Sequence, residues 1–206
     1  MRRVMLVLMM VMFLLVIGGC VRRWEYEGVS YSAPNWTSDG KIVFIRHHYI
    51  QKWEEIIPAI SEHQAGGREE IEVYEINNDG SGLRFVAGID SCEFEYGPEL
   101  CPISTSSAGD WIVLSMEDWR RGEHYPVMYI VKRNGDSLKE IGSGRNPDFS
   151  PDASRIVYEK PDSGIWVMNR DGSNDHCIVP DPDAKYPAWS PDDSCLLYTS
   201  DAADEL

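Results

Sequence analysis

The chain has 206 residues, of which 43% are hydrophobic and 26% are charged, a composition that is typical of a folded globular unit. Its 34 acidic residues outnumber its 19 basic residues and give a formal net charge of -15. A surface this acidic repels the phosphate backbone of DNA and RNA, so we expect no nucleic-acid partner.

The chain begins with the pattern of an export signal. Arg2 and Arg3 precede an apolar run at 4–16, which is shorter than the roughly 20 residues of a transmembrane helix, although a plain membrane anchor is the alternative. The run ends at IGGC (17–20), which resembles a lipobox, the cleavage motif of bacterial lipoproteins. This resemblance implies a signal peptide at 1–19 and lipidation of Cys20, followed by a linker to residue 32. We therefore expect a protein of the cell envelope that is lipid-anchored and faces the periplasm or the exterior.

The remaining cysteines fit an oxidising compartment. Cys92 and Cys101 bracket a short acidic segment, and in such a compartment the pair can close a small loop as a disulfide. The alternative is two independent thiols. We interpret Cys177 as a thiol of this kind, at the start of a strand.

The last residues have an unusual pattern. Residues 195–205 read CLLYTSDAADE, which matches the translation of a common transposase sequencing adapter. We expect residues 195–206 to be a sequencing artefact and the natural protein to depart from this sequence at about Ser194. The alternative is a genuine strand, because Leu196, Leu197 and Tyr198 have strand character.

An internal repeat organises the rest of the chain. Its first half occurs, from the clearest copy to the weakest, at 146–158, 186–194, 33–45 and 106–115. Its second half occurs at 71–86, 127–141 and 165–179. Each full unit predicts four short strands, because Pro, Asp-Gly and Asn-Gly turns separate short apolar runs. A sheet of this size has two faces to bury, and stacking against neighbouring sheets around an axis buries both.

The repeat resembles that of TolB-like β-propellers, a family with WD-like repeats. The resemblance rests on PAWSPD at 187–192 and on IWVMNRDGSN at 165–174, and it covers most of residues 33–194. It implies an all-β protein, an incomplete β-propeller of four-stranded blades with about three blades and the start of a fourth. Complete members of the family have more blades, so we expect the chain to be a fragment whose open ring leaves one blade face uncovered.

Propeller topology predicts where a ligand would bind. The loops that join second to third strands and the loops between blades share one rim, and in this chain those loops carry the insertions. One insertion, at 49–70, has Trp53, Ile56, Ile57 and Ile60 at helical spacing and predicts a short helix. The ligand-binding candidates come from two others: Tyr96, Trp119, Arg120, Arg121, His124 and Tyr125. Alternatively, the insertion helix only packs on its blade and the Arg pair is only solvated.

Patterns typical of catalysis are weak. Gly142, Ser143 and Gly144 superficially suggest a nucleophile elbow but fit a flexible connector between blades better. His47 and His48 lack a carboxylate at a telling spacing, so we predict no metal site, no catalytic residue and no cofactor. The leading hypothesis is a non-catalytic lipoprotein whose propeller binds an envelope protein, a peptide or a glycan. The alternatives are the propeller of a prolyl-oligopeptidase-like peptidase and, less favoured, a propeller polysaccharide lyase.

Overall fold

The computed structural model describes residues 20–57, 61–94, 100–118 and 125–200, and every helix or strand assigned there is a β-strand. In chain order the strands are β1 (Cys20–Trp36), β2 (Lys41–Ile57), β3 (Ser61–Asn77), β4 (Arg84–Phe94), β5 (Leu100–Ala108), β6 (Trp111–Asp118), β7 (Pro126–Lys132), β8 (Lys139–Gly142), β9 (Arg145–Phe149), β10 (Arg155–Lys160), β11 (Gly164–Asn169), β12 (His176–Val179), β13 (Lys185–Trp189) and β14 (Leu196–Thr199). Within these ranges no helix is long and apolar enough to cross a membrane.

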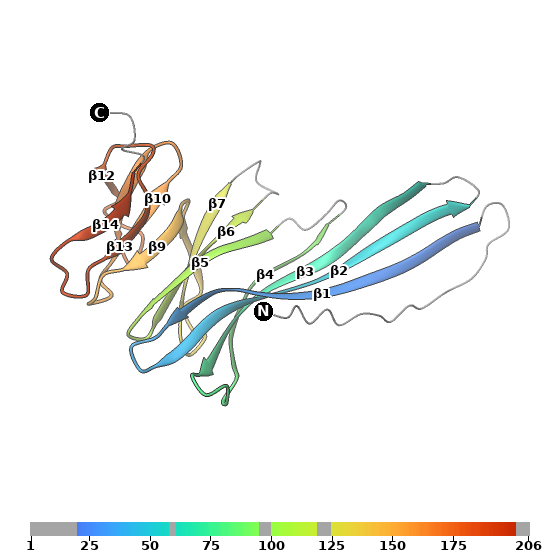
Figure 1. Cartoon of the computed structure of the whole chain (residues 1–206), viewed down its shortest axis with the longest axis horizontal. Coiled ribbons are helices and arrows are strands. Elements are labelled where there is room, and N and C mark those ends of the chain that lie inside the picture. The colour runs from blue at the N-terminus through green and yellow to red at the C-terminus, as the bar shows by residue number, and fades with distance from the viewer. Residues whose placement is uncertain (1–19, 58–60, 95–99, 119–124, 201–206) are drawn as a thin grey trace.

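Consecutive strands pair into antiparallel sheets. β1 to β4, β5 to β8 and β9 to β12 each form a four-stranded sheet in chain order, and β13 pairs with β14. We call these sheets blades one, two and three and the final hairpin unit four. Figure 1 shows them following one another along the long axis of the molecule. The strands of blade three coincide with the repeat halves predicted at 146–158 and 165–179, including Cys177 at the start of β12.

The hydrophobic core lies between the blades. One buried cluster joins Val43, Ile45 and Ile71 of blade one to Ile112 and Leu114 of blade two. A second cluster lies between blades two and three, and a third brings Trp189 and Leu196 of unit four against blade three. Because strand residues alternate between the two sides of a sheet, each inner blade buries both of its faces against neighbours.

The first strands of successive blades lie side by side and are joined by side-chain hydrogen bonds. Thr105 Oγ1 donates to the Ala33 carbonyl at 2.6 Å, and Ser106 Oγ donates to Asp148 Oδ1 at 2.6 Å. The other oxygen of Asp148 accepts the backbone N–H of Trp189 at 2.8 Å. Four-stranded sheets stacked face to face, with their first strands adjacent, make the chain an all-β protein with the architecture of an incomplete β-propeller.

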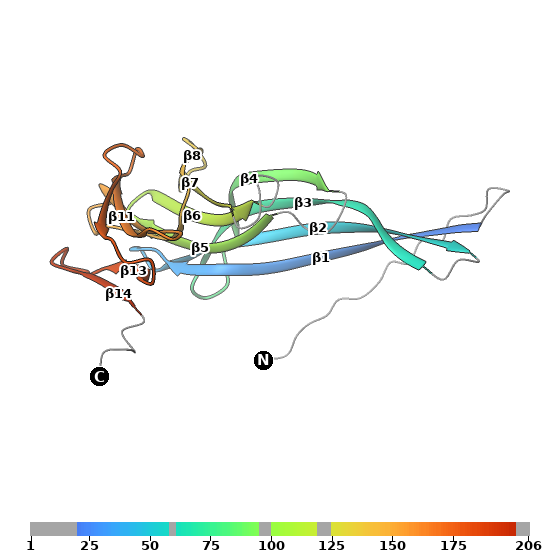
Figure 2. The same cartoon turned by 90° about the horizontal axis from the view of Figure 1, so that it is seen from above.

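The insertion helix predicted at 49–70 was wrong where the structure describes this segment. Residues up to Ile57 belong to β2, and β3 begins at Ser61 (Figure 2). The first residues of β1, which we expected as a linker, pair with β2 from Cys20↔Ile57 onward. In the ribbon β2 pairs with β1 on one side and with β3 on the other, whereas a helix of this length interrupted by Pro58 is marginal.

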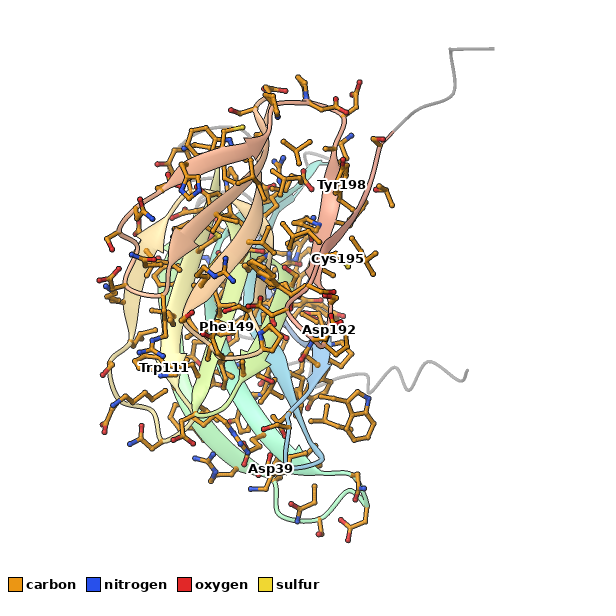
Figure 3. All side chains as sticks on the ribbon, turned by 90° about the vertical axis from the view of Figure 1, so that its left-hand side faces the viewer. Asp39, Trp111, Phe149, Asp192, Cys195 and Tyr198 are labelled. Carbon is orange, nitrogen blue, oxygen red and sulfur yellow. The ribbon has the colours of Figure 1, made fainter. Side chains whose placement is uncertain are left out.

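At the ends of the blades opposite the β2–β3 connection, tight turns of repeated geometry join the strands. In the turns between first and second strands, Asp39, Asp152 and Asp192 each accept a hydrogen bond from a Ser or Thr hydroxyl. Figure 3 labels one residue at or beside this turn from each of the four units: Asp39, Trp111, Phe149 and Asp192. We call this end of the stack the turn rim.

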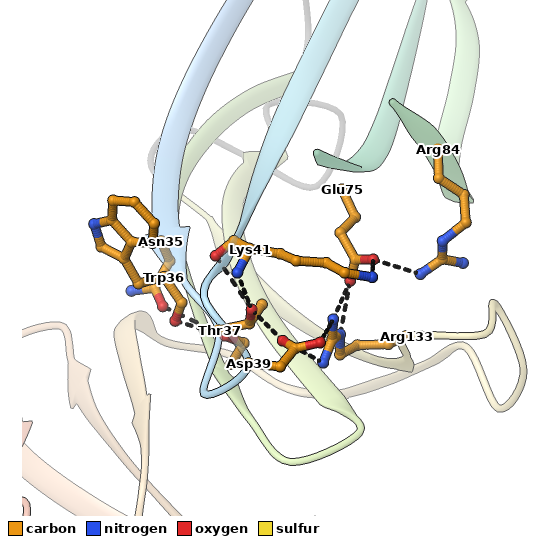
Figure 4. A network of polar contacts seen from close by, with 9 residues as sticks. Asn35, Trp36, Thr37, Asp39, Lys41, Glu75, Arg84 and Arg133 are labelled. Carbon is orange, nitrogen blue, oxygen red and sulfur yellow. Dashed lines mark hydrogen bonds and ion pairs between the residues drawn. The ribbon is translucent and has the colours of Figure 1, made fainter. Parts of the chain in front are cut away.

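An ion-pair network joins blades one and two at the turn rim (Figure 4). The Glu75 carboxylate, only 2% exposed, accepts hydrogen bonds from Lys41 at 2.8 Å, Arg84 at 3.2 Å and Arg133 at 2.7 Å. Arg133, which comes from blade two, also donates to Asp39 at 3.1 Å. Burial opposes the ionisation of Glu75, but the hydrogen bonds from the three cations outweigh it and lower its pKa. The Arg133 and Thr37 hydrogen bonds lower the pKa of Asp39 to about 2.

These pKa shifts predict loss of stability in acid. The pKa of Asp39, Asp152 and Asp192 is lowered from 3.8 to about 2 in the folded chain, so folding favours their ionised forms. We expect their contribution to the free energy of unfolding to be complete above pH 4 and to fall away as the pH drops towards 2. Urea unfolding followed by tryptophan fluorescence at each pH measures it. The Asp39→Asn variant should show a shallower slope, and an unchanged free energy of unfolding from pH 5 to 2 would contradict the prediction.

Candidate functional site

The ends of the strands opposite the turn rim form a second rim, from which the loops with insertions leave. β2 and β3, β4 and β5, and β6 and β7 all have such loop-bearing ends there, and Figure 1 shows those ends on the side away from the tight turns. We call this end of the stack the loop rim. The stacking of blades therefore gathers these connections on one side of the molecule, as the repeat predicts.

Of the ligand-binding candidates, Tyr125 lies within the described residues. It is 39% exposed, and its carbonyl accepts the backbone N–H of Asp118 at 2.9 Å. This hydrogen bond joins the two ends of the connection between β6 and β7. Trp119, Arg120, Arg121 and His124 of that connection, and Tyr96 of the connection between β4 and β5, lie outside the described residues.

For the three cysteines with a predicted lipid or disulfide, the structure describes only the position of the backbone. Cys20 is the first residue of β1, Cys92 pairs with Glu69 in β3, and Cys101 pairs with Glu117 in β6. The side chains of these three cysteines lie outside the described part of the chain, so the lipidation and the disulfide stay predictions. Cys177 and Cys195 are free thiols.

An ion pair between blades two and three stands at the base of the β6–β7 connection. Arg145, the first residue of β9, donates from Nε to Glu117 Oε1 at 2.6 Å, and Glu117 lies next to the end of β6. The Glu117 side chain is 13% exposed, and its second carboxylate oxygen is buried without a hydrogen-bond partner among the described residues. No local pattern predicts this ion pair, because its two members are far apart in the chain and belong to different blades.

A repeated backbone irregularity shapes the first strands near this rim. Ala33, Asn146 and Tyr186 each precede a proline and have positive φ values of 50°, 50° and 53°. In each of these strands the pairing with the second strand shifts register at this point, as in a β-bulge. Bulges re-aim side chains, and here the Asn146 amide donates to the buried Glu159 carboxylate at 3.0 Å. Near the start of β9 the loop rim therefore has the Glu117–Arg145 ion pair and, beside it, a buried carboxylate that accepts a hydrogen bond from an amide.

The two histidines of β2 that were considered as metal ligands, His47 and His48, each contact carboxylates. His47 Nε2 lies 3.0 Å from Glu69 Oε2 in a buried contact. His48 Nε2 lies 2.8 Å from Glu27, and its Nδ1 lies 3.3 Å from Glu70. Neighbouring residues of a strand point to opposite faces, so His47 and His48 cannot share one metal ion. No group of three or more His, Cys, Asp or Glu side chains in the described ranges could hold a metal.

The glycine-rich segment after β8 is a close-packed connector. A Cβ atom on Gly144 would lie 2.3 Å from the Tyr158 ring, so this position needs glycine for space. Ser143 Oγ donates to the Pro126 carbonyl at 2.7 Å, which ties the segment to the start of β7. The interpretation of residues 142–144 as an interblade connection agrees with this placement. The hydroxyl has a structural partner there.

Comparisons with known proteins give a likeness in fold. No family model matches the chain, and no curated protein matches it. Similar solved structures include an oligogalacturonate lyase from Vibrio parahaemolyticus (14% identity, TM-score 0.44) and the C-terminal WD40 domain of Sif2 (12% identity, TM-score 0.40). An acylaminoacyl peptidase is also similar (14% identity, TM-score 0.34). The matches cover 84%, 85% and 84% of this chain and 63%, 56% and 40% of those chains, respectively. These neighbours are propeller-type folds.

The ion pair at the loop rim predicts a measurable coupling. Replacing Arg145 alone (Arg145→Met) leaves the Glu117 carboxylate buried beside fewer donors, whereas Glu117→Gln together with Arg145→Met removes both charges. We expect a coupling energy of about 1–3 kcal/mol in a double-mutant cycle of urea unfolding free energies. Additive single-mutant effects would show that the two side chains do not stabilise each other.

Proposed function

We propose that the protein is a non-catalytic binding module of the cell envelope, anchored by a lipid on Cys20, and that it binds a protein, a peptide or a glycan with its loop rim. The observation that carries this proposal is the gathering of loop-bearing strand ends on one rim of a rigid stack. Function concentrates on loops that a rigid scaffold holds, because the scaffold removes much of the entropy cost of ordering them.

The β6–β7 connection is the centre of the proposed binding surface. The Asp118–Tyr125 backbone hydrogen bond joins its two ends, and the Glu117–Arg145 ion pair ties its base to blade three. Its sequence adds Trp119, Arg120, Arg121 and His124, and aromatic and Arg side chains are enriched among the residues that dominate binding energy at interfaces. Arg also suits carboxylate groups of a peptide or an acidic glycan.

Photo-crosslinking in the cells that produce the protein tests the binding surface. A benzophenone side chain at Tyr125 on the loop rim should crosslink to an envelope component. The matched control is Leu138, which is 37% exposed against 39% for Tyr125 but lies in the β7–β8 turn at the turn rim. We expect adducts from position 125 and none from position 138, because only the loop rim carries the proposed surface.

Two results would contradict this proposal. Equal adducts from positions 125 and 138 would mean that the loop rim is not a preferred surface. Turnover would favour the enzyme alternatives instead, so the purified chain is also incubated with oligogalacturonate and with an N-acylated peptide. Release of unsaturated sugars or of an acylated amino acid would replace the binding module with a lyase or a peptidase.

A substitution at Cys20 tests the anchor separately. The Cys20→Ser variant lacks the thiol that lipidation requires. We therefore expect this variant to incorporate no radiolabelled palmitate and to be absent from the membrane fraction after cell fractionation. Cys177→Ser is the matched control, since Cys177 is a free thiol in blade three, and it should label like the wild type. Labelling of the Cys20→Ser variant at the wild-type level would contradict lipidation at this position.

A further inference from the structure

The ribbon of β1, β2 and β3 extends beyond blade two at the loop rim (Figure 2). Thr105 of β5 bonds to the Ala33 carbonyl of β1, 72 residues earlier in the chain, and the same offset recurs two residues further along both strands. By this offset Leu100, the first residue of β5, lies level with Gly28. Residues 20–27 of β1 therefore lie past the end of blade two, where the described strands of that blade do not reach.

Strand register gathers aromatic side chains on one side of this extension. Trp24 lies opposite Trp53, and Gly28 lies opposite Tyr49. Residues opposite each other share a side of the sheet, and here it is the side from which Ile45 packs on blade two. We call this side of the extension the aromatic face, and it consists of Trp24, Tyr26, Gly28, Tyr49, Gln51 and Trp53. Tyr26 is 49% exposed, and the other aromatic side chains of the face are half-buried.

The Tyr49 ring lies against the neighbouring strand. A Cβ atom on Gly28 would lie 2.3 Å from Tyr49 Cζ, so the ring occupies the space that a side chain at this position would fill. The Tyr26 ring lies beside it, with the two ring centroids 6.0 Å apart and the ring planes tilted by 44°. Because one surface of the Tyr49 ring rests on β1, its other surface faces away from the sheet. Tyr49 therefore offers a flat aromatic surface to a ligand, with Tyr26 at its edge.

The two sides of the extension differ in charge. On the side opposite the aromatic face, Arg23 donates to Glu54 at 2.5 Å, and His48 contacts two further carboxylates. On the aromatic side, the carboxylate directly opposite Tyr49 belongs to Glu69 and is fully buried. Among the described side chains, the groups that the aromatic face presents to a ligand are therefore uncharged: aromatic rings, phenol hydroxyls and one amide.

These groups suit a sugar chain. An aromatic ring packs on the apolar C–H surface of a sugar ring, while hydroxyl and amide groups replace the hydrogen bonds that sugar hydroxyls lose with water. Two residues of a strand span about 7 Å, so neighbouring units of one sugar chain can contact successive side chains of the face. We propose that the aromatic face binds an uncharged glycan chain. This inference rests on the proposed function, because the face continues the loop rim and names the glycan as its ligand.

Other occupants fit the aromatic face less well. A further propeller blade would stack on the side of blade one that points away from blade two. A flat bilayer could not lie on the aromatic face without meeting blade two, which packs on the same side of β2. A chain with a formal net charge of -15 repels acidic polymers. An uncharged ligand is insensitive to screening, so we expect its affinity to be the same from about 0.05 to 0.5 M ionic strength.

Isothermal titration calorimetry of the full chain, in a detergent without a sugar headgroup, tests the proposal. The ligands are cellohexaose, chitohexaose and maltohexaose, which are uncharged, and hexagalacturonate, which is acidic. We expect at least one uncharged hexasaccharide to bind with a Kd below about 1 mM, and the Tyr26→Ala variant to bind it at least about fivefold more weakly. The matched control is Tyr31→Ala, because Tyr31 lies on the same strand but on the opposite side and is 66% exposed. This variant should bind like the wild type.

The Gly28→Ala variant tests the position of the Tyr49 ring separately. Its added methyl group would meet the far end of the Tyr49 side chain, so the ring must move while every aromatic group of the face is kept. We expect this variant to bind the hexasaccharide at least about threefold more weakly than the wild type. The matched control is Gly88→Ala on β4, where a Cβ atom meets nothing within 4 Å, and it should bind like the wild type.

The outcomes separate this inference from the proposed function. Thermal unfolding followed by circular dichroism establishes that the four variants fold like the wild type. No binding of any uncharged hexasaccharide by the wild type would overturn the proposal, and so would tighter binding of hexagalacturonate. Equal weakening by Tyr26→Ala and Tyr31→Ala would contradict the placement of the ligand on the aromatic face. Photo-crosslinks at Tyr125 without binding of these sugars would refute this inference alone and leave the proposed function standing.

Discussion

The structure depends on one constraint: no sheet in this chain can bury its apolar side chains alone. Alternation along each strand puts hydrophobic groups on both sides, and a four-stranded sheet has no third layer inside it. The buried clusters accordingly lie between blades, where Val43 and Ile45 contact blade two and Val113 and Met128 contact blade three. The stability of each blade is therefore the stability of its contacts with its neighbours, as in other repeat architectures.

Stacking also divides polar groups between the two rims. At the turn rim Glu75 is ionised in a buried site, because cations from both blades surround it and lower its pKa. At the loop rim the Glu117–Arg145 ion pair joins blade two to blade three beside the β6–β7 connection. Both networks cross a blade interface, so they depend on the apolar contacts between them. They also fix the register of one blade on the next, because a sliding blade would leave buried charges unpaired.

The sequence predicted what is local and missed what is not. The turn residues around Pro151 and Asp192 predicted β9, β10 and β13, since turn chemistry and strand patterns act over a few residues. The spacing of Trp53 and the isoleucines near it suggested a helix, but pairing with the distant β1 outweighs that preference. Trp24 lies directly opposite Trp53 in this ribbon, a contact that no pattern within either segment indicates.

The candidate site shows the same limit. The side of the stack that carries the insertions followed from topology, and Tyr125 is 39% exposed there. The partners of Glu117 and Asn146 could not be predicted, because they depend on how neighbouring strands and blades meet at a bulge. The contacts between blades at the turn rim, in contrast, do have a signal in the repeat. Arg133 and Arg170 occupy equivalent turn positions there, and an Arg that recurs at this position favours a contact between blades.

The ribbon formed by β1, β2 and β3 connects the fold to the proposed anchor. Cys20 pairs with Ile57 at its far end, and β1 runs without interruption from there to Trp36 in blade one (Figure 2). At about 3.3 Å per residue a strand of this length spans about 50 Å. A lipid on Cys20 would then place the ribbon end at the bilayer and hold the blades well away from it. Trp24 and Trp53 lie near that end, and Trp favours the membrane–water interface. A paired strand transmits orientation, which a flexible linker does not, so the proposed anchor would fix the direction in which both rims face.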